Sequence, residues 1–206
     1  MPGEAAGLIS DPAFKKARHD GNPEAFPFGE WFTGDNVNLA IGQGDVGVTP
    51  LQLANAYATF ANGGTRYAPN LGLEIRRPGG GVLRAVAPRV AAQVALPPQV
   101  RDPILQGLLG ATTDSRGTAT GAFLGFPLDQ YPVAGKTGTA QASGKKQDTA
   151  LFAAIAPAND PRYAVAVVME QAGFGATSAA PVARRVLGQL SGVEQGPVQL
   201  VSGGRG

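Results

Sequence analysis

The chain has 206 residues, which is enough for one large domain or for part of one. Hydrophobic residues make up 43% of it, close to the globular norm, and this excludes a chain that is disordered throughout. Charged residues reach only 16%, whereas glycine (30) and proline (17) are abundant, so many turns and long loops are expected. The net charge is +2 and no basic run exceeds two residues, so no nucleic-acid partner is expected.

Several kinds of chemistry are excluded by residue counts. The chain has no cysteine, which excludes disulfides, thiol nucleophiles and cysteine-bound metal sites. Its one histidine, His19, lies in a polar stretch, and the sequence contains no Gly-x-Ser-x-Gly turn. A Ser–His–Asp triad is therefore not predicted. We therefore expect no metal ion and no cofactor. No run of about 18 apolar residues occurs, so the sequence predicts no membrane-spanning helix.

The first quarter of the chain predicts one loop region and one helix. Residues 1–36 are rich in proline, glycine and charge, and we expect an extended, partly ordered loop that aromatic side chains anchor to a core: Phe26, Phe28, Trp31 and Phe32. Residues 49–62 predict a helix with Thr49 at its N-cap and Pro50 at its first position. Its buried face carries Leu53, Tyr57 and Phe60.

The middle of the chain predicts a hairpin, a second helix and a loop. Residues 71–75 and 82–86 flank a glycine-rich turn and predict the hairpin. Residues 98–112 predict a helix that either begins at Asp102–Pro103 or kinks there, because proline lacks the N–H of the helical ladder. Small residues at 117–125 indicate a loop. In the helix predicted at 98–112, the inward positions are Val100, Ile104, Leu105, Leu108 and Leu109.

The last third alternates as a sheet does. Residues 133–141, 151–156 and 163–169 predict three neighbouring antiparallel strands. A helix at 178–190 should pack on them, and a glycine-rich tail follows from residue 191. The predicted fold class is α+β, an antiparallel sheet with packed helices. The inward side chains of the last helix are expected to be Val182, Val186, Leu187 and Leu190.

The most informative segment is Lys136-Thr137-Gly138-Thr139 within the first of these strands. A strand places Lys136 and Gly138 on one side and the two threonines on the other. Gly138 admits a substrate backbone, and the strand could pair with an extended peptide. A phosphate-binding loop would need glycine at Gln130 and a following helix, so it is not favoured. The plain alternative is an edge strand with an exposed lysine.

Other segments strengthen the functional interpretation by resemblance to a known family. The run from Asn38 to Ala54 (NLAIGQGDVGVTPLQLA) continues to an ANGG at 61–64, PGEAAG stands at 2–7, and GTA stands at 117–119. Together with the Lys-Thr-Gly-Thr segment, they resemble the transpeptidase domain of penicillin-binding proteins, more narrowly the monofunctional, elongation-type class B members. The resemblance implies a penicillin-binding/serine β-lactamase-like transpeptidase fold.

The resemblance also implies that part of the active site is missing. That family uses Ser-x-x-Lys, Ser-x-Asn and Lys-Thr-Gly motifs, and only the third is present at its expected place. Ser143 and Lys146 fit Ser-x-x-Lys by letter, but they follow the third motif in an expected loop, so the match is interpreted as chance. We expect residues 1–190 to be the C-terminal portion of a transpeptidase domain, residues 191–206 a flexible tail, and the chain inactive alone.

By this resemblance, Lys136 is the candidate catalytic residue, and Thr137, Gly138 and Thr139 the candidate substrate-binding residues. A longer parent protein would cross-link peptidoglycan stem peptides and be acylated by β-lactams at a serine. It would lie at the extracytoplasmic face of the cell membrane, held by an N-terminal anchor absent from this sequence, with a membrane-embedded glycosyltransferase as partner. The alternative is a non-catalytic remnant or a fragment that only binds a partner.

Overall fold

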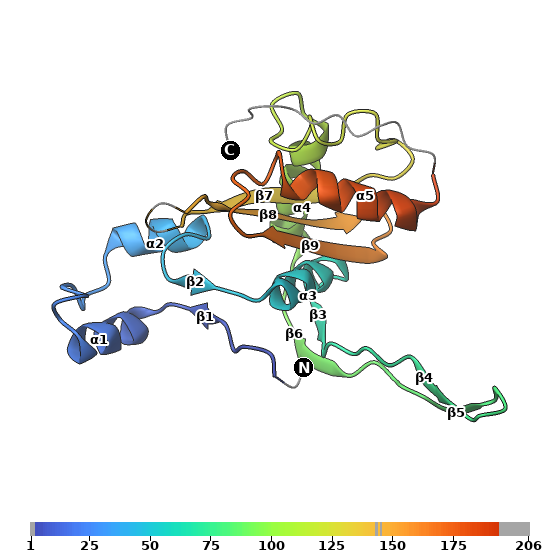
Figure 1. Ribbon diagram of the computed structural model, residues 1–206, viewed down its shortest axis with the longest axis horizontal. Coiled ribbons are helices and arrows are strands. Elements are labelled where there is room, and N and C mark those ends of the chain that lie inside the picture. Colours follow the sequence, from blue (N-terminus) through green and yellow to red (C-terminus); the bar gives the residue numbers. More distant parts are fainter. Residues whose placement is uncertain (1–2, 143, 145, 194–206) are drawn as a thin grey trace. The chain divides into compact units, whose positions relative to one another are not determined.

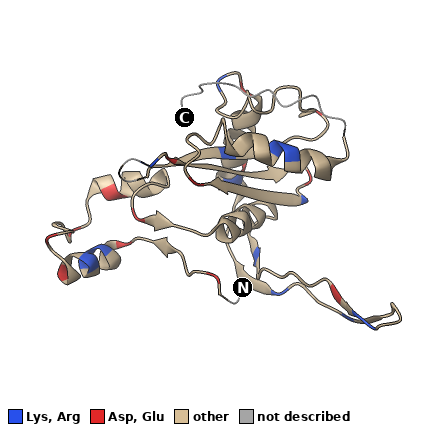
Figure 2. Cartoon of the chain, viewed as in Figure 1, with Lys and Arg blue, Asp and Glu red and all other residues tan. Residues whose placement is uncertain are grey.

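A computed structural model describes residues 3–142, 144 and 146–193, so most of the expected tail lies outside the described part. The chain divides into two compact units, an N-terminal unit up to Gln52 and a C-terminal unit from Leu53 onward. Within the described residues, no helix combines the length and apolar character that a bilayer crossing requires. Charged residues are interspersed along the elements (Figure 2).

Helices and antiparallel strands are mixed, which confirms the predicted α+β class. The helices are α1 (Pro12–Gly21), α2 (Thr33–Ala40), α3 (Pro50–Ala61), α4 (Pro98–Thr113) and α5 (Ala179–Ser191). The strands are β1 (Leu8–Ile9), β2 (Val46–Gly47), β3 (Thr65–Tyr67), β4 (Glu74–Arg76), β5 (Val82–Ala85), β6 (Val90–Gln93), β7 (Ala134–Ala140), β8 (Thr149–Ala156) and β9 (Tyr163–Met169).

The N-terminal unit contains more helix than the sequence predicts. Residues 1–36 were expected to be a loop, but α1 and the start of α2 lie there. The reason is local: the Asp11 side chain accepts a hydrogen bond from the Phe14 N–H at 2.7 Å, and Pro12 occupies the first turn. Such an N-cap stabilises a helix that has little apolar periodicity of its own.

The prediction that four aromatic side chains anchor this region to a core is wrong, because two of them are exposed and the other two are only partly buried. Phe28 is 64% exposed and Phe32 is 46% exposed, and their rings meet edge to face at 6.0 Å. Phe26 and Trp31 are partly buried. The described part of this unit has no fully buried hydrophobic side chain, so there is no core to hold the rings.

Helix α3 confirms the predicted helix and its N-cap. The Thr49 hydroxyl accepts from the Gln52 N–H at 3.1 Å, and the Gln52 amide oxygen accepts from the Thr49 N–H at 2.8 Å. This reciprocal pair is a capping box. The helix is followed by Gly64, whose φ is +108° and whose Cβ, if present, would lie 2.0 Å from the Val94 carbonyl oxygen. Only glycine fits this close approach between β3 and β6.

The hairpin and the second predicted helix are also confirmed. Strands β4 and β5 pair antiparallel, as do β3 and β6. Helix α4 begins at Pro98, so Pro103 lies inside it and does not begin it. Of the predicted inward positions, Leu105, Leu108 and Leu109 pack against the buried core. Val100 and Ile104 are instead about half exposed.

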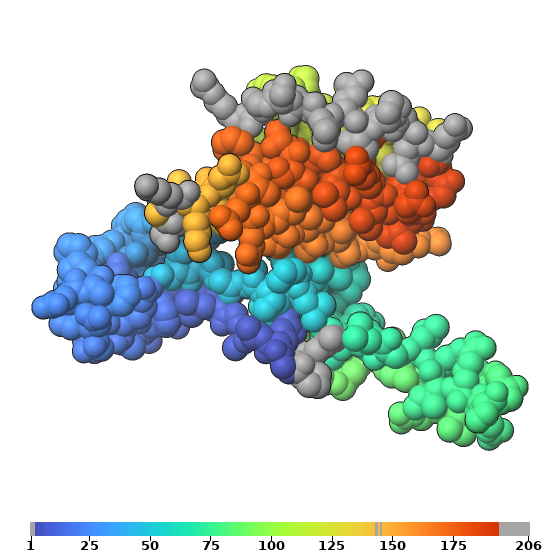
Figure 3. All heavy atoms as spheres, in the orientation of Figure 1, coloured from blue at the N-terminus to red at the C-terminus, as the bar shows by residue number. Residues whose placement is uncertain are grey.

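The C-terminal unit is built on the three-stranded antiparallel sheet β7-β8-β9, as predicted. Helix α5 covers one face of the sheet and contacts β8 and β9, and α4 contacts β7 (Figure 1). Phe152 and Ala154 point toward the α5 side, whereas Ala134 and Ile155 pack against α3 and α4. In the space-filling view, α5 and the sheet form one continuous block (Figure 3).

The face that α5 buries differs from the predicted one. Leu187 is buried as expected, but Val182, Val186 and Leu190 are exposed by roughly two fifths. The buried positions are instead mostly small, which lets the helix backbone approach the sheet closely. They are Ala179, Ala180, Pro181, Ala183, Arg184, Leu187 and Gly188.

Candidate active site

Strand β7 carries the predicted site residues at the edge of the sheet. It pairs with β8 on one side, and no strand of the described residues pairs with its other side. Helix α4 contacts β7, and the Thr112 hydroxyl of α4 donates to the carbonyl of Val133, just before the strand, at 2.6 Å. The Ala119 N–H donates to the Ala111 carbonyl at 2.8 Å and so joins the connection after α4 to the helix. Lys136 and the three residues after it therefore lie on an edge strand.

Lys136 is the exposed member of the run. It is paired with Ala153 of β8, and its ammonium donates to the Thr137 carbonyl oxygen at 2.7 Å. An ammonium has three N–H donors, and this bond uses one of them. Its position in mid-strand also rules out the phosphate-binding loop, in which the lysine begins a helix. Lys136 can thus place a positive charge at the sheet edge.

Thr137 points to the other side of the strand and is only 7% exposed. Its hydroxyl lies 2.8 Å from the hydroxyl of Thr118, a residue of the connection between α4 and β7. Either oxygen can be the donor. Thr118 itself is exposed, so the two hydroxyls form a pair with one buried and one accessible member.

Gly138 and Thr139 lie further along the same edge. The Cβ that Gly138 lacks would contact the Leu151 side chain at 3.3 Å. The backbone of Gly175 also approaches Gly138: a Cβ on Gly175 would lie 2.5 Å from the Gly138 carbonyl oxygen. Thr139 is partly buried and is engaged with another group. Because Gly175 lacks a side chain, the segment before α5 packs closely against β7.

A shallow cavity of about 410 Å³ lies beside Lys136. It is lined by the last turns of α4 and the following connection. Two cationic side chains, Lys136 and Arg116, face one anionic side chain, Asp114, which gives the lining a net charge of +1. The Arg116 guanidinium lies 3.6 Å from the Asp114 carboxylate and offsets its charge. Such a lining favours an anionic ligand.

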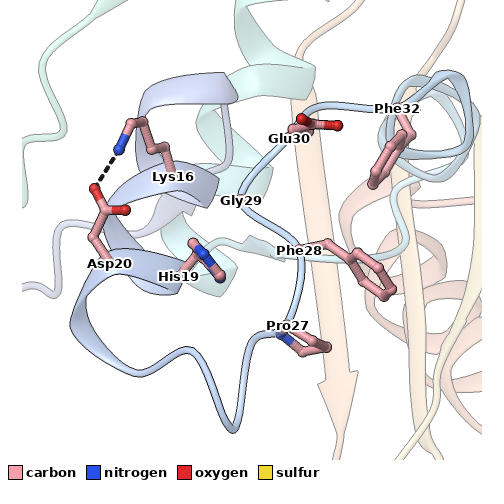
Figure 4. Close-up of a pocket in the computed structure, with 8 residues that line it drawn as sticks. All are labelled: Lys16, His19, Asp20, Pro27, Phe28, Gly29, Glu30 and Phe32. Atoms are coloured by element: carbon pink, nitrogen blue, oxygen red, sulfur yellow. Dashed lines mark hydrogen bonds and ion pairs between the residues drawn. The ribbon is translucent and has the colours of Figure 1, made fainter.

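A second cavity lies in the N-terminal unit and has a volume of about 510 Å³ (Figure 4). Lys16 forms an ion pair with Asp20 at 2.5 Å, and the His19 ring nitrogen Nδ1 lies 2.7 Å from the Phe26 carbonyl oxygen. These three polar side chains have structural partners. The remaining lining consists of Pro27, Phe28, Gly29, Glu30 and Phe32. Across the described chain, no group of three or more acidic or histidine residues could hold a metal ion.

Comparison with known proteins decides the family. The model of the penicillin-binding protein transpeptidase domain matches residues 13–188. The chain belongs to the penicillin-binding protein transpeptidase family. The chain is 33% identical over 181 residues to the peptidoglycan D,D-transpeptidase MrdA of Haemophilus influenzae, covering 76% of the chain and 26% of the relative.

Other relatives give the same result. The D,D-transpeptidase PbpA of Mycolicibacterium smegmatis is 33% identical over 186 residues, covering 82% of the chain and 36% of PbpA. The crystal structure of Pseudomonas aeruginosa PBP2 in complex with WCK 5153 matches with a TM-score of 0.73 at 33% identity, over 97% of the chain and 41% of that structure. The chain thus spans about a quarter to just over a third of the length of these curated relatives.

Sequence reasoning assigned Lys136, Thr137, Gly138 and Thr139 to the site, and the structure places all four on β7. It gave no role to Thr118, although the Gly-Thr-Ala segment contributed to the resemblance. Nothing in the spacing of Thr118 and Thr137 reveals their hydrogen bond, since it depends on how the chain turns after α4. Ser143 lies outside the described residues, and Lys146 is exposed.

Proposed function

We propose that the chain forms one wall of the active site of a peptidoglycan D,D-transpeptidase, with Lys136 as the charged group of that wall. The observation that carries the proposal is the Lys-Thr-Gly-Thr run on an edge strand, beside a cavity whose lining is net positive. Relatives named as D,D-transpeptidases, together with an acyl-enzyme complex of Mycobacterium tuberculosis penicillin-binding protein A with imipenem, support the same chemistry.

The reaction proceeds through an acyl-enzyme. A serine oxygen attacks the carbonyl carbon of the penultimate D-Ala, the bond to the terminal D-Ala nitrogen breaks, and D-Ala leaves after its nitrogen takes up a proton. An amine of a second stem peptide then attacks the ester and releases the serine. The serine and its lysine partner come from a segment outside this sequence, because the one Ser-x-x-Lys match follows the Lys-Thr-Gly run.

Each residue of the β7 run has a role in this scheme. Lys136 places its charge beside the reacting serine, where it stabilises the transition state more than the ground state. The terminal carboxylate of the stem peptide, or that of a β-lactam, is held by Thr139 and by the hydroxyl pair that includes Thr137. The backbone N–H near Thr139 serves in the oxyanion hole, and the outer edge of β7 can pair with an extended peptide. The Gly175 backbone packs closely on Gly138 of the strand.

The partners and location of the longer protein follow from this activity. Peptidoglycan is cross-linked outside the cell membrane, so the site acts at the extracytoplasmic face, with anchoring supplied outside this sequence. A membrane-embedded glycosyltransferase would supply the glycan strands that carry the stem peptides. The competing proposal is a non-catalytic remnant that binds a partner only, and it predicts that no combination with a nucleophile-bearing segment restores acylation.

A hybrid protein tests the proposal. In this hybrid, the chain replaces the segment of Pseudomonas aeruginosa PBP2 that it matches, so the serine comes from PBP2. Fluorescent penicillin should label the hybrid covalently and should not label the 206-residue chain alone. If the hybrid unfolds cooperatively but is not labelled, the competing proposal of a non-catalytic remnant would be favoured. A labelled band from the chain alone that maps to Ser143 would overturn the proposed source of the nucleophile.

A further inference from the structure

The hydroxyl pair beside Lys136 contains a residue to which no role has been given. Thr118 belongs to the connection after α4, and its hydroxyl oxygen lies 2.8 Å from that of Thr137. Thr118 and Lys136 both line the cavity of about 410 Å³, whereas Thr137 is not part of its lining. The accessible member of the pair is therefore the residue that sequence reasoning did not include.

Burial determines the direction of the hydrogen bond between the two threonines. Two hydroxyls carry two hydrogens, and the bond between them uses one. Thr137 is 7% exposed, and its side chain lies on the same face of the sheet as that of Phe152. Among the described residues, Thr118 is the one hydrogen-bond partner of its hydroxyl. A buried O–H without an acceptor is costly, so Thr137 donates to Thr118. The remaining hydrogen belongs to Thr118.

Resting on the function proposed above, we infer that Thr118 is a further substrate-binding residue. Its hydroxyl donates to the carboxylate of the stem peptide or the β-lactam, in the cavity that it shares with Lys136. Thr137 is then a positioning residue, because its hydroxyl donates a hydrogen bond that fixes the Thr118 oxygen. The net positive lining attracts the carboxylate, and a hydrogen bond to a charged group is stronger than one between neutral groups.

The first test measures acylation of the hybrid by benzylpenicillin, as the second-order rate constant. Thr118→Val should lower this constant about tenfold, since a hydrogen bond to a charged group is lost. Thr118→Ser keeps the hydroxyl and should restore most of it, and Thr137→Val should cost less than Thr118→Val. Thr120→Val is the matched control, because the Thr120 hydroxyl of the same connection donates to the Asp114 carbonyl at 2.6 Å.

The outcomes separate this inference from the proposed function. An unlabelled wild-type hybrid argues against the proposed function itself. A labelled hybrid in which Thr118→Val reacts at the wild-type rate overturns only the role of Thr118. Equal losses in Thr118→Val and Thr120→Val would show that the connection merely needs intact packing, and a larger loss in Thr137→Val would assign the contact to Thr137.

A second measurement uses the 206-residue chain itself. N-acetyl-D-alanyl-D-alanine, titrated into ¹⁵N-labelled chain, should shift the amide signals of Thr118 and Gly138 weakly but saturably. The C-terminal amide of the same peptide lacks the carboxylate and should shift them far less. Thr118→Val should remove this preference for the acid, and Thr118→Ser should keep it. An acid preference that survives Thr118→Val overturns the inference, as does a wild-type chain without any preference.

Discussion

Neighbouring residues of β7 differ in exposure because a strand turns successive side chains to opposite faces. Lys136 is exposed at the outer edge, whereas Thr137 is buried beside the side of the sheet that α5 covers. The alternation itself could be predicted from four letters of sequence. The partner of Thr137 could not, since Thr118 lies 19 residues earlier and reaches the strand through a turn.

Gly175 is a position where one added carbon should be costly. A Cβ there would lie 2.2 Å from the Leu151 carbonyl oxygen and 2.5 Å from that of Gly138, and neither backbone group can move without distorting the sheet. We expect Gly175→Ala to destabilise the hybrid by about 1–3 kcal/mol and to lower its thermal midpoint. Gly107→Ala is the control: it has open space in α4 and should be neutral or stabilising.

Asp35 in the N-terminal unit should titrate below the usual range of an aspartate. The Lys15 ammonium donates to its carboxylate at 2.6 Å and the Phe32 N–H donates at 2.7 Å, and both bonds lower the pKa of Asp35. The stability that this carboxylate contributes is therefore complete above the unfolded-state pKa and is lost as the pH falls through the lower folded-state pKa.

The titration of Asp35 can be followed by NMR of its carboxyl carbon. Lys15→Met should raise the pKa of Asp35 toward its ordinary value. Lys16→Met is the matched control, because Lys16 pairs with Asp20 and should leave Asp35 unchanged. An Asp35 pKa that is the same in both variants would show that the ion pair does not form in solution.

Among the elements, α3 shows how much a local signal can specify. Its N-cap, its proline and its apolar spacing agree, and the structure has the helix within one residue of the predicted bounds. The strands β7, β8 and β9 were likewise predictable, because alternation and turn residues coincide. Helix α1 was missed because its signal is a cap, Asp11-Pro12, without an apolar stripe.

The buried face of α5 was predicted wrongly for a different reason. Large apolar side chains usually face a core, but here glycine and alanine face the sheet and the valines face away. Arg184 belongs to the buried set, and its guanidinium donates to the Leu124 carbonyl at 3.3 Å. Close backbone packing of this kind depends on the tertiary arrangement, which periodicity does not reveal.

The capping box of α3 gives a prediction at the element scale. Thr49→Ala removes the acceptor for the Gln52 N–H and the donor to the Glu4 carboxylate, which lies 2.5 Å away. We expect a loss of about 0.5–2 kcal/mol in stability, read from the thermal midpoint. The pKa of Glu4, which the Thr49 hydroxyl lowers, should rise. Thr49→Ser should preserve both properties, and an unchanged Glu4 pKa in Thr49→Ala would contradict the contact.

For the whole molecule, exposed apolar side chains are the main liability. Leu71 and Leu73 near β4 are 86% and 81% exposed, and Val100 and Ile104 of α4 are about half exposed. Contiguous apolar surface favours association. We expect the isolated chain to self-associate with rising concentration in sedimentation velocity. A chain that stays monomeric and melts in one sharp transition would show that these surfaces need no partner.

Lys136 is proposed to act beside a serine that another segment supplies. The most direct test is the acylation rate of the hybrid by fluorescent penicillin, measured with Lys136 intact and with Lys136→Ala. Removing a charge that acts mainly on the transition state should slow acylation by about 10²-fold or more, while the thermal midpoint stays unchanged. Thr139→Val should weaken carboxylate holding more modestly. A Lys136→Ala hybrid that is labelled at the wild-type rate would contradict this role of Lys136.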